Sequence, residues 1–136
     1  MTGLARDVVV VSCAVSAGIH GALVPAHLAE STGAGLGFLA ATGLLALLAL
    51  VLTRRPSSTL APLGAAAVLA GLIGAYALAV TAGLPPFHPE AEPVDGLAAF
   101  TKAVEATGLA AAALSLLRSA RPAFAPISPN PKGTHT

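Results

Sequence analysis

The chain alternates between long apolar runs and short polar breaks. Four apolar runs cover about residues 8–28, 35–52, 60–84 and 95–117. A membrane-spanning helix needs roughly 20 apolar residues, so each run has a suitable length. Because each run is apolar nearly all round, none leaves a polar face for water to cover. The pattern predicts an all-α protein: a four-span transmembrane helical bundle at residues 1–121, followed by a Pro-rich disordered tail at 122–136.

The polar breaks contain residues that typically end and begin helices. Polar and glycine residues at 30–33 mark the first turn, and two arginines and a proline at 54–56 mark the second. The Ser-Ser-Thr stretch at 57–59 is suited to capping the third helix. Pro93 is a good first residue for the fourth helix, whereas Pro25 could kink the first.

Composition supports a membrane protein and excludes other classes. Of the 136 residues, 55% are hydrophobic and 10% are charged, whereas a soluble domain carries about 25% charged residues. A formal net charge of +1 gives no basic surface for nucleic acid. We therefore expect a lipid bilayer as partner, with no nucleic acid. One cysteine, Cys13, rules out an intrachain disulfide. With no nucleophile–base pair or cofactor motif, we expect a non-enzymatic protein.

The basic residues predict the orientation. Excluding Lys102, which lies within a span, the lysines and arginines fall on one side of a four-span bundle: Arg6, Arg54, Arg55, Arg118, Arg121 and Lys132. The loops near Glu30 and at 85–95 contain neither residue type. The positive-inside rule then places both termini in the cytoplasm of a multi-pass protein of the cell (inner) membrane.

Polar side chains form a stripe along the first run and another along the fourth. At 100° per residue, each stripe falls within about 80° of one helix face: Ser12, Ser16, His20, His27 and Glu30, and then Asp95, Lys102 and Glu105. Ionisable groups inside a membrane are costly and usually face the bundle interior. We therefore expect the two stripes to face each other.

The helical rise predicts that the deeper residues meet at one level. His20 lies about 15 Å below Glu30, while Lys102 and Glu105 lie about 13 and 18 Å below Pro93. These depths predict an intramembrane polar cluster of His20, Lys102 and Glu105. It could be a structural hydrogen bond or ion pair between helices, or it could have a proton-linked or ion-linked role.

The shallower residues suggest a divalent metal site. His27 and Glu30 are spaced i, i+3, so one ion could bind both. The further ligands would be His88 and one carboxylate of the next loop: Glu90, Glu92 or Asp95. Imidazole with carboxylate suits Zn²⁺, Fe²⁺, Mn²⁺ or Cu²⁺. Alternatively, these residues simply lie at the headgroup level. Bis-histidine haem would need a second subunit, because His20 and His27 share one helix.

Pairs of small residues predict close helix packing. They are Gly33 with Gly37, Gly71 with Ala75, and Gly108 with Ala112. Such pairs let two helix backbones approach. We interpret them first as packing within the bundle and second as contacts of a homodimer or larger complex.

Several segments resemble one group of membrane proteins. Ile19-His20 and residues 23–30 are similar to the first helix of small, uncharacterised four-helix integral membrane proteins of actinobacterial type. Residues 83–85, residues 92–94 and the pair Lys102 and Glu105 also match that group. Ala26 departs from it, because an acidic residue often precedes the histidine there. The resemblance implies the four-helix topology and supplies no activity.

Three function classes remain from the sequence. The first is an integral membrane protein with an outward-facing His/carboxylate site that binds a divalent metal. The second is a structural or accessory subunit of a membrane complex. The third is a proton-coupled small transporter or channel that acts as a dimer and uses His20 and Glu105.

Overall fold

The computed structural model describes residues 1–83 and 94–120, and these residues form four α-helices without a strand. The helices are α1 (Gly3–Glu30), α2 (Thr32–Arg54), α3 (Leu60–Ala82) and α4 (Gly96–Ala120). Each of these four described helices is long and apolar enough to cross a membrane. The prediction of an all-α bundle with four spans is confirmed.

Some predictions concern residues outside the described ranges. The predicted metal ligands His88 and Glu92 and the predicted disordered tail at 122–136 lie there. They stay predictions. The predicted helix start near Pro93 is wrong, because Val94 and Asp95 are not helical and α4 begins at Gly96.

Side-chain caps set the bounds of α1 and α2. Thr2 Oγ1 accepts the N–H of Ala5 at 3.4 Å, so α1 begins before the apolar run that predicted it. Ser31 has an extended backbone, and its N–H donates to the carbonyl of His27 at 2.9 Å. Its hydroxyl then accepts the N–H of Ala34 at 3.1 Å. One residue thus ends α1 and begins α2.

Caps also begin α3 and α4. The hydroxyl of Ser58 accepts the N–H of Ala61 at 3.2 Å, as the Ser-Ser-Thr stretch predicted. Asp95 Oδ1 accepts the N–H of Ala98 at 2.6 Å and begins α4. At the end of α3, Gly83 has a φ of 73°, which glycine adopts without strain.

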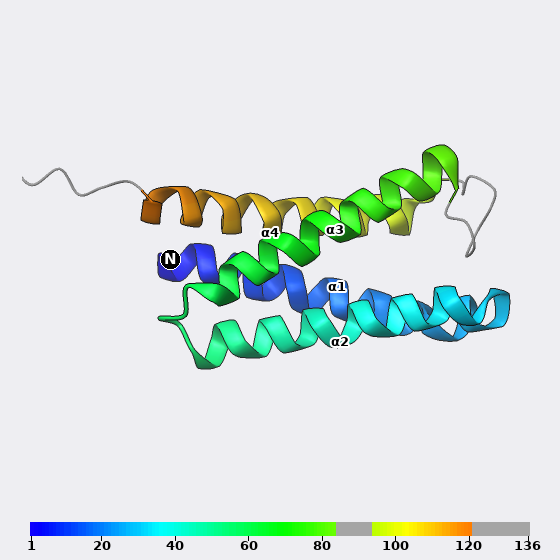
Figure 1. Ribbon diagram of the computed structural model, residues 1–136, viewed down its shortest axis with the longest axis horizontal. Helices are drawn as coiled ribbons and strands as arrows, with labels where there is room; N and C mark the ends of the chain where they lie inside the picture. Colours follow the sequence, from blue (N-terminus) through cyan, green and yellow to red (C-terminus); the bar gives the residue numbers. More distant parts are fainter. Residues whose placement is uncertain (84–93, 121–136) are drawn as a thin grey trace, which may run out of the picture.

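The helices run alternately up and down (Figure 1). The chain start, the α2–α3 turn and the end of α4 lie at one end of the bundle, and the turn at Ser31 lies at the other. The first end, which we name the arginine end, carries the four arginines of the described residues: Arg6, Arg54, Arg55 and Arg118. The opposite end is named the Ser31 end. This one-sided arrangement is the one that the four-span pattern predicts.

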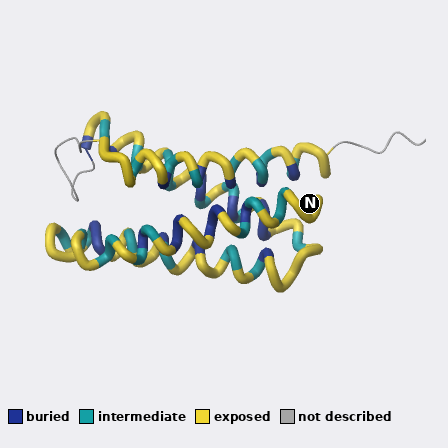
Figure 2. The backbone as a smooth tube through the Cα atoms, turned by 180° about the vertical axis from the view of Figure 1, so that it is seen from behind, coloured by how far each residue is buried: buried dark blue, intermediate teal, exposed yellow. Residues whose placement is uncertain are grey.

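The half of the bundle toward the arginine end is closely packed. Leu45 and Leu69 are fully buried together with Val9 and Cys13, and buried residues face inward between the helices (Figure 2). Gly108 of α4 lies against α1, because a Cβ there would be 2.6 Å from the Cβ of Ser12. Such an approach requires glycine.

The predicted small-residue pairs have different surroundings. Gly108 and Ala112 are buried inside the bundle, which confirms the packing interpretation for that pair. A Cβ at Gly37 or Gly71 would have no described atom within 4 Å. These two glycines therefore do not mediate close contacts among the four described helices.

Candidate functional site

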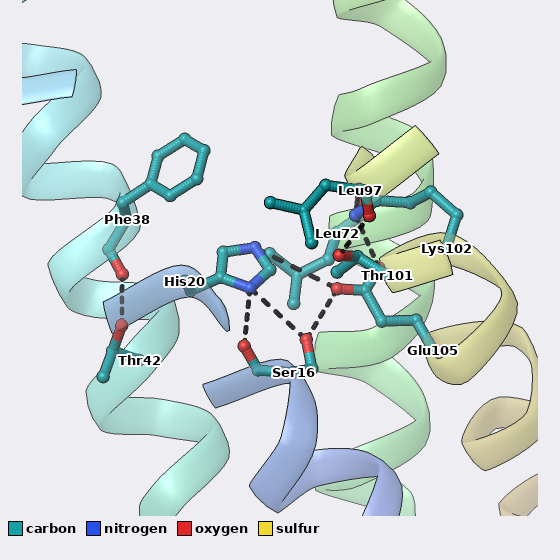
Figure 3. A network of polar contacts seen from close by, with 9 residues as sticks. All are labelled: Ser16, His20, Phe38, Thr42, Leu72, Leu97, Thr101, Lys102 and Glu105. Atoms are coloured by element: carbon teal, nitrogen blue, oxygen red, sulfur yellow. Dashed lines mark hydrogen bonds and ion pairs between the residues drawn. The ribbon is translucent and has the colours of Figure 1, made fainter. Parts of the chain in front are cut away.

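The predicted intramembrane cluster lies between α1 and α4 (Figure 3). Glu105 is completely buried. Lys102, one turn earlier on α4, donates from Nζ to Glu105 Oε2 at 2.6 Å. From α1, the hydroxyl of Ser16 donates to Glu105 Oε1 at 2.7 Å. Both carboxylate oxygens therefore have a partner, which a buried carboxylate requires. The sequence predicted the cluster, and the structure adds Ser16 to it.

The hydrogen bonds of His20 fix the position of one ring proton. Nδ1 lies 2.9 Å from the backbone carbonyl oxygen of Ser16, and a carbonyl oxygen only accepts hydrogen bonds. Nδ1 therefore carries a hydrogen, and Nε2 is the nitrogen that gains or loses a proton. Nε2 lies 4.0 Å from Glu105 Oε1, which is too long for a hydrogen bond but close enough for an ion pair when the ring is protonated.

Lys102 connects the cluster to α3. Its Nζ donates to the carbonyl of Leu72 at 3.4 Å and lies 5.3 Å from the centre of the Tyr76 ring. The Lys102 side chain is 18% exposed, whereas that of Glu105 is fully buried. The ammonium group thus lies at the edge of the cluster, and the carboxylate lies at its centre.

A cavity of about 360 Å³ lies beside this cluster, toward the Ser31 end. All four helices contribute to it, and its wall is mostly apolar. The polar residues of the wall are His20, His27, Tyr76, Asp95, Thr101 and Lys102. Small-molecule sites typically have volumes of about 300–1,000 Å³, so the cavity could hold a small ligand.

Tyr76 carries an unsatisfied polar atom. Its hydroxyl is buried, and no residue of 1–83 or 94–120 forms a hydrogen bond with it. Buried hydroxyl groups nearly always have a partner, and an exception calls for an explanation. Because Tyr76 belongs to the cavity wall, a ligand in the cavity is one such explanation.

Phe38 of α2 lies against both histidines of α1. Its ring is stacked on His27 with centroids 3.7 Å apart and is tilted against His20 at 5.2 Å. The imidazole of His27 is also held by its Nδ1, which donates to the carbonyl of Leu23 at 3.0 Å. Phe38 therefore limits the movement of both rings at the cavity wall.

Sequence reasoning missed Phe38 and Tyr76, because an apolar residue in an apolar span does not stand out. One available signal was rarity: the chain has four Phe, one Tyr and no Trp. An aromatic side chain within a span of mainly Ala, Leu and Gly fills space that its neighbours cannot.

The predicted metal ligands are only partly placed. His27 and Asp95 both belong to the cavity wall, and Glu30 lies exposed in the last turn of α1. Asp95 also caps α4 through its carboxylate. Within the described ranges, no group of three His, Cys, Asp or Glu residues could hold a metal ion. The metal site stays a prediction that depends on His88 and Glu92.

Comparisons with protein families, curated proteins and solved structures found no match to this chain. The resemblance to small membrane proteins of actinobacterial type therefore stays a prediction. What the chain itself establishes is a helical integral membrane protein with four apolar spans and a His/Lys/Glu cluster around the buried Glu105, beside a cavity.

Proposed function

We propose that this chain is a proton-linked membrane protein: a small proton-coupled transporter or channel that acts as a dimer. In this proposal both termini lie in the cytoplasm, and the cavity faces outward across the cell (inner) membrane. The arginines at one end of the bundle support that orientation. One observation carries the proposal: His20 lines the cavity, and its Nε2 lies 4.0 Å from the buried carboxylate of Glu105.

The geometry gives His20 the position of a proton acceptor. An imidazole changes charge near neutral pH. A proton that enters from the cavity can bind the lone pair of Nε2, because Nδ1 already carries a hydrogen. The resulting cation lies beside Glu105, which stabilises it by charge attraction.

Other charged and titratable groups face the same place. Lys102 lies on the far side of the carboxylate and opposes a second positive charge, and His27 and Tyr76 belong to the same cavity wall. From α2 comes the uncharged ring of Phe38. Burial of the ring disfavours its charged form; beyond that, the protonation of His20 depends on Glu105, Lys102 and the contents of the cavity.

A purely structural cluster would have less need of His20. The hydrogen bond from Ser16 to Glu105 already joins α1 to α4, and Lys102 already neutralises the carboxylate. A histidine that borders both the carboxylate and a cavity is more typical of a proton-transfer group. The dimer is proposed because a chain of this size has few helices with which to enclose a complete pathway.

The test is proton flux in proteoliposomes that contain a pH-sensitive dye, under an imposed pH gradient. Flux is measured in buffer alone and with three solutes that cross bilayers slowly: propane-1-sulfonate, tetramethylammonium and urea. We expect flux above protein-free vesicles in at least one condition. We expect His20→Asn and Glu105→Gln to reduce it to the protein-free level.

The matched control is Ser115→Ala. Ser115 is also a buried polar residue of α4, and its hydroxyl donates to the carbonyl of Ala111 near the arginine end. This variant should keep the wild-type flux. Wild-type flux equal to that of empty vesicles in all conditions, or flux that is unchanged in His20→Asn, would contradict the proposal and favour an accessory role.

Metal binding is the second candidate function. It is favoured by the position of His27 and Asp95, an imidazole and a carboxylate that belong to the wall of the same cavity. Purified protein exposed to Zn, Fe, Mn and Cu should then retain a near-stoichiometric metal. His27→Ala should lose this metal. Asp95→Asn keeps a side chain that can cap a helix, so metal loss in that variant would identify Asp95 as a ligand.

A further inference from the structure

We infer that the cavity binds a small organic anion with an apolar body, and that it does so together with the proton on His20. This inference rests on the proposed function, because it names the ligand that would accompany the proton. Three features of the cavity carry it: the charge of the cluster, the available hydrogen-bond donors and the apolar wall.

Charge favours an anion over a cation. Lys102 and Glu105 neutralise each other at 2.6 Å, so protonation of His20 leaves the cluster with one net positive charge. An uncompensated charge within a membrane is strongly unfavourable. An anion in the cavity offsets it, and the anion in turn favours the protonated imidazole. The proton and the anion should therefore bind cooperatively.

Among the described residues, Asp95 is the one carboxylate in the wall of this cavity. It is exposed, and its Oδ1 accepts the N–H of Ala98 at 2.6 Å. Water and the start of α4 therefore stabilise its negative charge. The charge of Asp95 therefore repels an anion beside His20 and Lys102 less than a buried charge would. The preference of the cavity for an anion remains.

Several hydrogen-bond donors lie at the polar side of the cavity. An ammonium group has three N–H donors, and the described contacts of Lys102 use two of them, to Glu105 and Leu72. The buried hydroxyl of Tyr76 has no partner among the described residues. Protonated His20 adds the N–H of Nε2. A ligand with several acceptor oxygens, such as a carboxylate or a sulfonate, complements these donors.

The rest of the wall favours an apolar body. It consists mainly of aliphatic and small side chains from all four helices, with the ring of Phe38 against both histidines. A volume of about 360 Å³ lies near the lower end of the range for small-molecule sites. The ligand is therefore a small amphiphile: a short apolar body with one anionic group.

The test uses the fluorescence of Tyr76, which is the single tyrosine of a chain without tryptophan. The full chain is kept in dodecyl maltoside and titrated with propane-1-sulfonate between pH 5.5 and 8.5. The sulfonate stays ionised throughout, so any pH dependence comes from the protein. We expect saturable binding whose apparent Kd rises about tenfold per pH unit on the alkaline side of the His20 transition, since only the protonated form binds.

Matched ligands decide the charge class. Propyltrimethylammonium and propan-1-ol have similar apolar bodies with a positive charge and no charge, and both should bind at least about tenfold more weakly at pH 5.5. Equal or tighter binding of either would overturn the inference. So would sulfonate binding that does not depend on pH, or no saturable sulfonate binding at any pH. These outcomes need no mutant and do not depend on a variant folding.

Variants and lipid then locate the anion and its source. His20→Asn should bind the sulfonate weakly and without pH dependence, whereas Ser115→Ala should behave as wild type. Competition by added phosphatidylglycerol, with the same pH dependence, would assign the anion to a lipid headgroup; no competition would assign it to a solute. If the cation binds instead while proton flux persists, the anion inference is wrong and the proposed function stands. If the sulfonate binds as expected but no proton flux occurs, the anion inference stands and the proposed function is wrong.

Discussion

The two halves of the bundle differ in how the space between the helices is filled. Toward the arginine end, Leu45, Leu69 and their neighbours pack against one another, and α4 approaches α1 at Gly108. Toward the Ser31 end, the same four helices surround a cavity of about 360 Å³. The buried cluster of Ser16, His20 and Glu105 lies at the boundary between the two halves.

The difference suggests that one half of the bundle positions the cluster and the other half gives space for a ligand. Close packing fixes side chains in single positions, so the arginine half can hold α1 and α4 in register. That register determines whether Ser16 and His20 meet Glu105. The half with the cavity then has space that a ligand or water can occupy. The cluster of Ser16, His20 and Glu105 is therefore held in place by the packed half and can be reached from the cavity.

The largest effect should come from unpairing the buried ions. Glu105→Leu leaves the Lys102 ammonium without its carboxylate, and Lys102→Met leaves the Glu105 carboxylate without its ammonium. Loss of one member of a buried pair typically costs about 3–5 kcal/mol. We expect a loss of this size in the free energy of unfolding, measured by reversible unfolding in mixed detergent micelles.

The double variant Lys102→Met/Glu105→Leu sharpens the comparison. Replacing both ions with apolar side chains is often neutral for stability. We expect the double variant to unfold within about 1 kcal/mol of wild type and to lose proton flux. If the double variant is as unstable as the single variants, the Lys102/Glu105 pair is needed for stability, and the cluster between the two halves has a structural role.

The next effect concerns the packed half. Gly108→Leu places a side chain where even a Cβ would be 2.6 Å from Ser12 Cβ and 3.1 Å from Leu69 Cδ1. Overpacking of this kind costs about 1–3 kcal/mol, which the same unfolding measurement would detect. Gly71→Leu is the matched control, because a Cβ there meets no described atom within 4 Å. Equal destabilisation by both would mean that Gly71 packs against a second copy.

The smallest effect concerns the half with the cavity. Phe38→Ala removes the ring that is stacked on His27 and tilted against His20. An aromatic pair contributes about 0.5–1.5 kcal/mol beyond the area it buries. We expect modest destabilisation together with clear shifts of both imidazole signals in NMR spectra. Phe100→Ala, at an exposed position of α4, should leave those signals in place; if it shifts them equally, Phe38 does not position the histidines.

Much of the fold could be predicted from the sequence, because membrane spans depend on long local patterns. The apolar runs gave four helices in the correct order, and the stripe of polar residues on α1 placed Ser16 and His20 toward Glu105. Burial of ionisable groups is so costly in a membrane that few arrangements of His20, Lys102 and Glu105 were available. Their meeting could therefore be predicted from helical geometry alone.

The parts that could not be predicted depend on contacts between helices. Nothing local distinguishes Gly108, which lies against Ser12, from Gly71, which meets no described atom. The carboxylate of Asp95 was predicted as a metal ligand, and the structure also gives it the helix-capping role that Asp commonly has. The cavity itself results from how far four helices separate, which no single stretch of sequence encodes.

The joint between α1 and α2 has a consequence for how this protein can vary. A single residue, Ser31, separates the two helices. Each residue added to a helix turns the later part of that helix by about 100°. One extra residue in the first turn of α2 would therefore turn Phe38 away from the two imidazoles and bring Gly37 into its place. We therefore expect variants of this protein to keep the length of this joint more strictly than its sequence.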